Sequence, residues 1–329
     1  MDDSLVRLVA FSAAVLPAEV ILVYFMTYLN ADILDETVWA GFGFGACAAF
    51  PAILLALGAM TIVNTFDGVI WQAMGKAFLG ASIPEEICKF LTIVCLFHKQ
   101  LKKLSPSHIF LVAIAVSTGF ACLENIFYVI EDESWGVLAL MRSLSAVPGH
   151  AFVGAVMGYC IVQAQDPDRQ SVTWWALGLT GPIILHGLYD FPLVALDGGV
   201  ADQEVLLYVL LFLLVVVLEG GLAHYYLKSF IGAEENAKNP MWEPANMLKA
   251  VRWANATACN HWHWIFWALV CFFLATGLLF GRFHMDHDTG YKIYYVTSFA
   301  VFAVLHGCAF VALAMISRRR KKARQFIHS

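Results

Sequence analysis

The sequence predicts an all-α protein, a polytopic bundle of about nine transmembrane helices. Of its 329 residues, 60% are hydrophobic and only 14% are charged, whereas soluble domains carry about 25% charged residues. The apolar residues also gather in repeated runs of about 20 residues, the length that a helix needs to cross a bilayer. These runs are too long for the strands of a membrane barrel, so helices remain as the spanning structure.

The expected spans follow from these runs in chain order. They cover about residues 6–29, 38–63, 77–98, 108–130, 138–163, 174–196, 204–229, 261–282 and 292–316. The first span follows an acidic start, MDDSLVRLVAF, rather than a basic one, so we expect a retained helix and not a signal peptide. The stretch FDGVIWQAMGKAF (66–78) mixes aromatic and charged residues. We expect it either to lie at the membrane interface or to lengthen the third span.

Basic residues gather in three segments that alternating spans place on one side of the membrane. These segments are HKQLKKLSPSH (98–108), the connection at 230–260 and the tail RRRKKAR (318–324). The positive-inside rule makes that side cytoplasmic. The N-terminus is therefore expected outside and the C-terminus inside, in a multi-pass protein of the cell membrane. We expect the lipid bilayer as a partner and no nucleic acid.

One hydrophilic connection divides the expected organisation of the chain. Residues 1–230 would form the membrane-embedded core, and residues 231–260, with Pro240 and Pro244, a cytoplasmic connecting loop. Residues 261–329 would form a two-helix appendage with the basic tail.

Ionisable side chains inside the predicted spans are the main indication of function. On insertion scales each costs at least about 2.5–3.5 kcal/mol at the bilayer centre, so each calls for a reason. Most of them gather in the third to sixth spans: Glu85, Glu86, Lys89, Glu124, Arg142, His150, His186 and Asp190. At a rise of about 1.5 Å per residue, five of these eight lie roughly 18–24 Å from the cytoplasmic ends of their spans. This common depth predicts one layer of polar groups in the outer half of the bilayer.

Spacing along the helices places these residues on shared faces. Positions i, i+3 and i+4 share a helix face, so Glu85 or Glu86 can lie on the same face as Lys89. By the same rule, His186 and Asp190 share a face. Gly154 and Gly158 lie on the same helix face as His150, and small residues let a neighbouring helix approach closely.

Carboxylates and imidazoles that converge in a dry pocket suit two kinds of chemistry. They can hold a divalent metal, or a carboxylate can act as general base on a water that attacks a peptide carbonyl. A histidine or Asn125 would then stabilise the oxyanion, and Lys89 and Arg142 would balance the negative charge. The same residue types also relay protons or cations in transporters. However, we find no inverted repeat and no paired broken helices of the kind that transporter sites use.

A structural role is the alternative for each of these groups. Glu85 and Glu86 would then be buried partners of Lys89 or Arg142 that fix the packing of the helices. Three further ionisable residues lie outside the motifs and are expected in structural or supporting roles: Glu19, Glu219 and His224.

Four short motifs occur in order on consecutive spans. They are EExxK (Glu85, Glu86, Lys89), FxxxEN (Phe120, Glu124, Asn125), RxxxxxPxH (Arg142, Pro148, His150) and HxxxD (His186, Asp190). This set resembles the PrsW family of intramembrane proteases, within the superfamily of CAAX prenyl proteases and bacteriocin-immunity (Abi) proteins. The resemblance covers roughly residues 70–200. It marks the expected core as PrsW-like, with its motifs at 84–190.

The resemblance implies a peptidase that cleaves membrane-anchored protein substrates, as in the site-1 cleavage of anti-sigma factors. It implies Glu85 or Glu86 as the base that activates water. We favour Glu85, with Glu86 as a ligand or orienting group. Glu124 and His186 would help to hold the water or a metal, although the related CAAX proteases carry histidine in the second motif. Asp190 would orient His186 or the substrate. A relative that binds transmembrane substrates without cutting them is a further alternative.

Metal dependence stays open at this stage. The candidate metal ligands are Glu86, Glu124, His150 and His186, and two histidines with glutamates suit Zn²⁺ with one open position. His150 would be a further ligand or an oxyanion partner. The same residues also suit a metal-free pair of glutamate and histidine. The remaining motif residues are expected to bind or orient the substrate: Lys89, Asn125 and Arg142.

Overall fold

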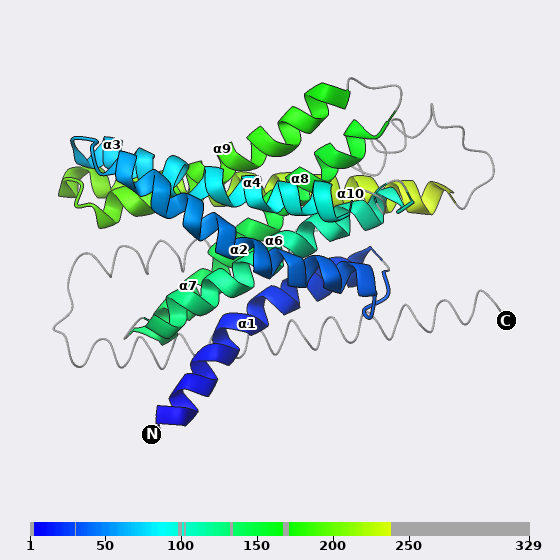
Figure 1. Cartoon of the computed structure of the whole chain (residues 1–329), viewed down its shortest axis with the longest axis horizontal. Helices are drawn as coiled ribbons and strands as arrows, with labels where there is room; N and C mark the ends of the chain where they lie inside the picture. The colour runs from blue at the N-terminus through cyan, green and yellow to red at the C-terminus, as the bar shows by residue number, and fades with distance from the viewer. Residues whose placement is uncertain are drawn as a thin grey trace.

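A computed structural model describes residues 3–29, 31–97, 101, 103–131, 134–166 and 171–237 of the chain. Every regular element in these ranges is helical (Figure 1). Six helices of this part are long and apolar enough to cross a membrane, by length and composition. The predicted all-α class is therefore confirmed for the described part. The predicted spans at 261–282 and 292–316, the connection at 238–260 and the basic tail lie outside it.

The helices have the following bounds: α1 (Asp3–Tyr28), α2 (Glu36–Val63), α3 (Val69–Met74), η1 (Gly75–Ser82), α4 (Ile83–Leu91), η2 (Thr92–Leu96), α6 (Pro106–Glu131), α7 (Trp135–Leu144), α8 (Ala146–Ala164), α9 (Ser171–Asp197) and α10 (Asp202–Ala237). The two elements η1 and η2 are wider π-helices. The six apolar spans are α1, α2, α6, the pair α7 and α8, α9 and α10. Each overlaps one of the predicted spans.

The third predicted span is helical but is built from four short segments, α3, η1, α4 and η2. Its first segment shows that the stretch at 66–78 lengthens this helix, because α3 continues directly into η1. Within η1, the ring of Phe78 lies so close to Gly187 of α9 that a Cβ atom would not fit there. Since Gly187 follows His186, this contact holds the first-motif helix against the fourth-motif helix.

The fifth predicted span, 138–163, consists of two helices in the structure. The break lies at Ser145, whose φ of -128° and ψ of -65° depart from helical values. Pro148 explains it, because proline has no N–H to bond the carbonyl of the residue four positions earlier, Leu144, and its ring would clash with that carbonyl. Arg142 therefore lies in the last turn of α7, and His150 lies in the first turns of α8.

Two packed helices, α6 and α8, form the centre of the bundle. In the most apolar window of α6, and likewise of α7 and α8, 83% of the residues are buried, against 22% for α2. Their contact runs along the predicted small residues. A Cβ added to Gly154 would lie 2.6 Å from Ser117, and one added to Gly158 would lie 2.8 Å from Ala113. These close contacts bring the second and third motifs together.

The starts of α2 and α6 are joined by one polar group. The carboxylate of Asp35 caps α2 by accepting hydrogen bonds from the amides of Thr37 (2.9 Å) and Val38 (3.1 Å). Its other oxygen lies 2.8 Å from Nε2 of His108, in the first turn of α6. Such a cap satisfies helix N–H groups that have no partner within the helix.

Candidate functional site

The first motif lies on α4, where its three ionisable residues meet. Nζ of Lys89 is 2.7 Å from Oε1 of Glu86 and 3.4 Å from Oε2 of Glu85. It also lies 4.2 Å from the centre of the Phe120 ring. The side chains of Lys89 and Glu86 are fully buried, whereas that of Glu85 is 14% exposed. Both predicted pairs along the helix thus form, and Glu85 is the more accessible carboxylate.

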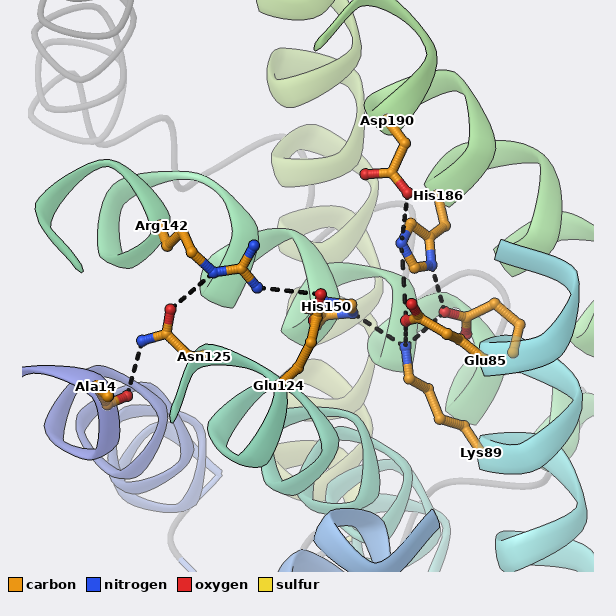
Figure 2. Close-up of polar contacts among 10 residues, drawn as sticks. Ala14, Glu85, Lys89, Glu124, Asn125, Arg142, His150, His186 and Asp190 are labelled. Atoms are coloured by element: carbon orange, nitrogen blue, oxygen red, sulfur yellow. Dashed lines mark hydrogen bonds and ion pairs between the residues drawn. The ribbon is translucent and has the colours of Figure 1, made fainter. Parts of the chain in front are cut away.

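His150 connects this group to α6. Its Nδ1 lies 3.0 Å from Nζ of Lys89, and its Nε2 lies 2.8 Å from Oε2 of Glu124. The imidazole is therefore held between the first and second motifs, as Figure 2 shows. Because a carboxylate only accepts hydrogen bonds, the proton belongs on Nε2 and the lone pair of Nδ1 faces Lys89.

His186 connects the same group to α9. Its Nδ1 lies 2.8 Å from Oε1 of Glu86, and its Nε2 lies 3.2 Å from Oδ2 of Asp190 and 3.9 Å from Oε2 of Glu85. The His186 and His150 rings are 5.0 Å apart and nearly perpendicular. With a carboxylate on each ring nitrogen, a proton or a metal ion has to lie between Nδ1 and Glu86.

The two histidines share one arrangement that suits a metal site. Each presents Nε2 to a carboxylate and Nδ1 toward the first motif, the pattern in which a second carboxylate orients a metal-binding imidazole. One ligand atom each from Glu85, Glu86, His150 and His186 lies within 4.8 Å of the others. In addition, Oε2 of Glu86 is buried and has no hydrogen-bond partner among the described residues. These donors fit a divalent metal in type and spacing.

Two predicted roles differ from this geometry. Glu124 was expected among the metal ligands, but it lies behind His150 and outside the group of four donors. Glu85, expected only as the base, lies inside that group. The reason is that Glu124 pairs with Arg142, whose Nη2 lies 3.2 Å from its Oε1.

Asn125 also lies farther from the cluster than an oxyanion donor would. Its Oδ1 accepts a hydrogen bond from Nε of Arg142 (2.8 Å), and its Nδ2 donates to the carbonyl of Ala14 in α1 (2.8 Å). The side chain is fully buried, and Figure 2 shows it on the side of Arg142 that faces α1. This geometry fits the predicted orienting role and does not support oxyanion stabilisation by Asn125.

A cavity of about 320 Å³ adjoins the two histidines. Its polar walls come from Glu124, Arg142, His150, His186, Asp190 and Glu219, and most of its other walls are apolar. The sequence assigned Glu219 of α10 only a structural or supporting role. The buried stripe of α10 is the signal that could have placed it inside, because Phe212, Val215, Val216, Glu219 and Ala223 recur at helical spacing.

Comparison with known proteins finds relatives of one family. A family described as "PrsW family intramembrane metalloprotease" matches residues 35–218. Protease PrsW of Bacillus subtilis is 31% identical over 196 residues, which are 57% of this chain and 84% of that protein. Protease PrsW of Halalkalibacterium halodurans is 30% identical over 183 residues, with 54% and 80% coverage. Protease PrsW of Geobacillus kaustophilus is 31% identical over 189 residues, with 56% and 79% coverage. No solved structure matches the chain.

The matched region contains all four motifs and the two histidines with their carboxylate partners. It also covers more than half of a chain whose described part has six apolar helices of spanning length. The chain therefore belongs to the PrsW family of intramembrane metalloproteases and is a multi-pass membrane protease.

Proposed function

We propose that this protease cleaves membrane-anchored proteins at the cluster of Glu85, Glu86, His150 and His186. The observation that carries the proposal is the convergence of four ligand atoms from three helices within 4.8 Å. A carboxylate stands behind each imidazole, at 2.8 Å for His150 and 3.2 Å for His186. Such support fixes the orientation of a catalytic group before the substrate binds.

Glu85 is the proposed general base. Its side chain is 14% exposed, and its nearest cation, Nζ of Lys89, is 3.4 Å away. Glu86 is fully buried, and one of its oxygens contacts both Lys89 and His186 at 2.7 and 2.8 Å. Glu85 is thus the carboxylate that a water can reach. It would accept a proton from the attacking water and then transfer it to the leaving amine.

Glu86, His150 and His186 are the proposed ligands of a Zn²⁺ ion. Two histidines and one glutamate with an open fourth position form a known type of catalytic zinc site. When bound, the ion supplies a nucleophilic water at neutral pH and polarises the peptide carbonyl. The ammonium of Lys89 contacts His150 and Glu86, at 3.0 and 2.7 Å. It therefore competes with the metal for these donors and balances their charge in its absence.

We further propose the orientation and organisation that the loop charges predict. The N-terminus would lie outside and the C-terminus inside, in a nine-span protein of the cell membrane. The site would then lie in the outer half of the bilayer. Such a site suits extracytoplasmic, site-1 cleavage of substrates such as anti-sigma factors. Residues 1–230 would form the protease core, 231–260 a cytoplasmic loop and 261–329 an appendage. Fusions of reporter enzymes to the predicted loops test the orientation.

A cleavage assay tests the proposed chemistry. The protein is co-expressed with tagged single-span substrates, and Glu85→Gln, Glu86→Gln and His186→Ala are compared with it. We expect each variant to lose cleavage by about 10²-fold or more, because a positioned base alone contributes on this order. Glu204→Gln, an exposed acid at the start of α10, is the matched control and should remain active. Proton-coupled uptake without cleavage of any substrate would contradict the proposal.

The metal has its own measurement. Elemental analysis of the purified protein should find zinc in about one equivalent, and His150→Ala should lose most of it. Cleavage should also stop on chelation and return with added Zn²⁺. A fully active protein that contains no metal would exclude the zinc assignment but would remain compatible with Glu85 as the general base.

A further inference from the structure

Glu219 lies inside the bundle at the wall of the cavity that adjoins the active-site cluster. It is on the buried stripe of α10, between Val216 and Ala223, and its side chain is only 1% exposed. One of its carboxylate oxygens lies 3.4 Å from the position of a Cβ on Gly149, the neighbour of His150. It is therefore next to the third motif, although it follows the last residue, 218, of the family match.

Both carboxylate oxygens of Glu219 are buried and have no hydrogen-bond partner among the described residues. An unpaired polar group of this kind is costly, and an isolated charge more so. A buried polar group without a partner in the folded protein calls for a reason, and a ligand supplied from outside is one. Glu219 is one of the residues that line the cavity, so a ligand in the cavity would lie beside its side chain.

The other acids of this site already have partners of the opposite or exchangeable charge. Glu124 lies 3.2 Å from Arg142. Glu86 lies 2.7 Å from Lys89, and Asp190 lies 3.2 Å from Nε2 of His186. Glu219 is thus the cavity-lining carboxylate that forms no ion pair in the described part of the chain. Because a buried carboxylate is stable only with a partner, a ligand that stabilises its ionised form would be a cation.

The walls around Glu219 are apolar enough for a long side chain. Phe212, Leu193, Met141 and Val153 line the cavity together with Glu219. Lysine and arginine side chains bury their methylene stems against such surfaces while the charged head meets a polar partner. A cavity of about 320 Å³ is at the lower end of the usual size of a ligand site.

We propose that Glu219 is a specificity-determining residue that binds a basic side chain of the substrate near the bond that is cut. This inference rests on the proposed function, because it names the substrate feature that the same site selects. Glu219 does not belong to the group of four metal-compatible donors. Its contact is therefore with the substrate and not with the catalytic metal.

Substrates that differ at one position test this selection. A tagged single-span substrate carries Lys, Arg, Met or Gln at each position around its cleavage site in turn. We expect kcat/KM to be at least about tenfold higher for Lys or Arg than for Met at one of these positions, because a buried charge pair contributes this much or more. Glu219→Gln should bring the ratio close to one while it still cuts the Met substrate. Glu219→Lys should favour Asp or Glu at that position. Glu204→Gln is the control on the same helix.

Binding separates this proposal from the proposed catalytic roles. The Glu85→Gln protein and the double variant Glu85→Gln/Glu219→Gln, both in detergent micelles, are titrated with the Lys and Met forms of the single-span substrate. The inference is supported if the Glu85→Gln protein binds the Lys form more tightly than the Met form and the double variant does not. This result would stand even if the parent protein cut no substrate, an outcome that would contradict only the proposed chemistry. Equal binding of Lys and Met forms by the Glu85→Gln protein would overturn the inference. The inference would also be overturned if Glu219→Gln lowered kcat/KM equally for all substrates and lowered the unfolding temperature. That result would indicate a purely structural role.

Discussion

Lys89 balances the charge of the carboxylates that surround it. Its Nζ lies within 3.4 Å of Glu85, Glu86 and His150, and the side chain has no exposure to solvent. Breaking a buried ion pair by removing one partner costs about 3–5 kcal/mol, because the other charge stays buried and uncompensated. We expect Lys89→Met to destabilise the protein by about this amount. Denaturant unfolding of the purified protein in detergent measures it.

Two comparison variants make this test specific. Lys103→Met removes an exposed lysine before α6 and should change the free energy of unfolding little. The double variant Lys89→Met/Glu86→Gln should recover part of the loss, because it removes the uncompensated carboxylate as well. Equal effects of Lys89→Met and Lys103→Met would show that the buried pair contributes nothing to stability.

The roles of individual residues could be predicted only in part from the sequence. Helical spacing was enough to place Glu86 with Lys89 and His186 with Asp190, and both pairs form. Spacing does not say which carboxylate points into the cluster and which points behind a histidine, because that depends on neighbouring helices. Glu124 lies behind His150 because Arg142, from the separate helix α7, attracts its second oxygen.

At the scale of helices, α2 and α6 approach each other so closely at Gly45 and Gly119 that neither position has room for a Cβ atom. A Cβ on Gly119 would collide with the backbone of Phe42, and one on Gly45 would collide with the backbone of Val116. Packing of this kind is the main force between membrane helices, since burial in lipid gives no hydrophobic gain. We expect Gly119→Ala to cost about 1–3 kcal/mol or more, the range for an overpacked core. Cleavage should fall with it, because α6 carries Glu124.

Gly43→Ala is the matched control for this prediction. It lies on the same helix pair, in α2, and a Cβ there would meet no atom within 4 Å. Thermal unfolding and the yield of folded protein in detergent should fall for Gly119→Ala alone. If both variants unfold at the temperature of the parent protein, α2 and α6 can separate without loss, and the close contact is not required.

The cap at the start of α2 should make stability depend on pH. Partial burial raises the pKa of Asp35, but the hydrogen bonds from His108 and from the Val38 and Thr37 amides outweigh it, so the pKa is lowered. A carboxyl with a lowered folded-state pKa stabilises the fold above its unfolded pKa of about 3.9 and loses this contribution as the pH falls. We expect Asp35→Ala to cost about 0.5–2 kcal/mol at pH 7, as for other caps.

The measurement compares unfolding of the parent protein and Asp35→Ala between pH 7 and pH 3. The difference between them should shrink as the pH falls below about 4, because Asp35 of the unfolded chain then takes up a proton that the folded carboxylate binds less readily. Asp32 is an exposed acid whose carboxylate accepts a hydrogen bond from the nearby Leu34 amide, and Asp32→Ala should show a smaller effect throughout. A difference that stays constant with pH would mean that Asp35 stabilises α2 without its charge.

At the scale of the whole molecule, hydropathy predicted the spans that are continuous and apolar. It missed two interruptions whose causes are local. Ser145 separates α7 from α8 because of Pro148, and the third span consists of short α and π segments around the charged residues of α4. Averaging over about 20 residues, the scale of a membrane span, hides both features. The rise of a helix predicts one layer of ionisable residues, and Glu86, Glu124, His150, His186 and Asp190 do belong to one network of contacts with Lys89.

In the described part of the chain, the first and last long helices, α1 and α10, pack into the same apolar core. One apolar cluster joins α1, α2, α6, α8 and α10 through Leu22, Val38, Phe110, Ala151 and Phe230. The rings of Phe110 and Phe230 lie 4.5 Å apart, so the far end of α10 is packed against the start of α6. The group of four metal-compatible donors and the cavity lie within the same part.

This shared core predicts that the protease folds and cuts its substrates without the segment after α10. A chain that ends after residue 237 keeps every helix of the core, and it should cut the same single-span substrates at an undiminished rate. A chain that ends after residue 201 loses α10, and with it Phe230 and the Glu219 wall of the cavity, and it should not fold. Cleavage in co-expression and thermal unfolding in detergent measure both. A chain ending at 237 that is folded but inactive would contradict the division, because residues beyond α10 would then have to complete the site or admit the substrate.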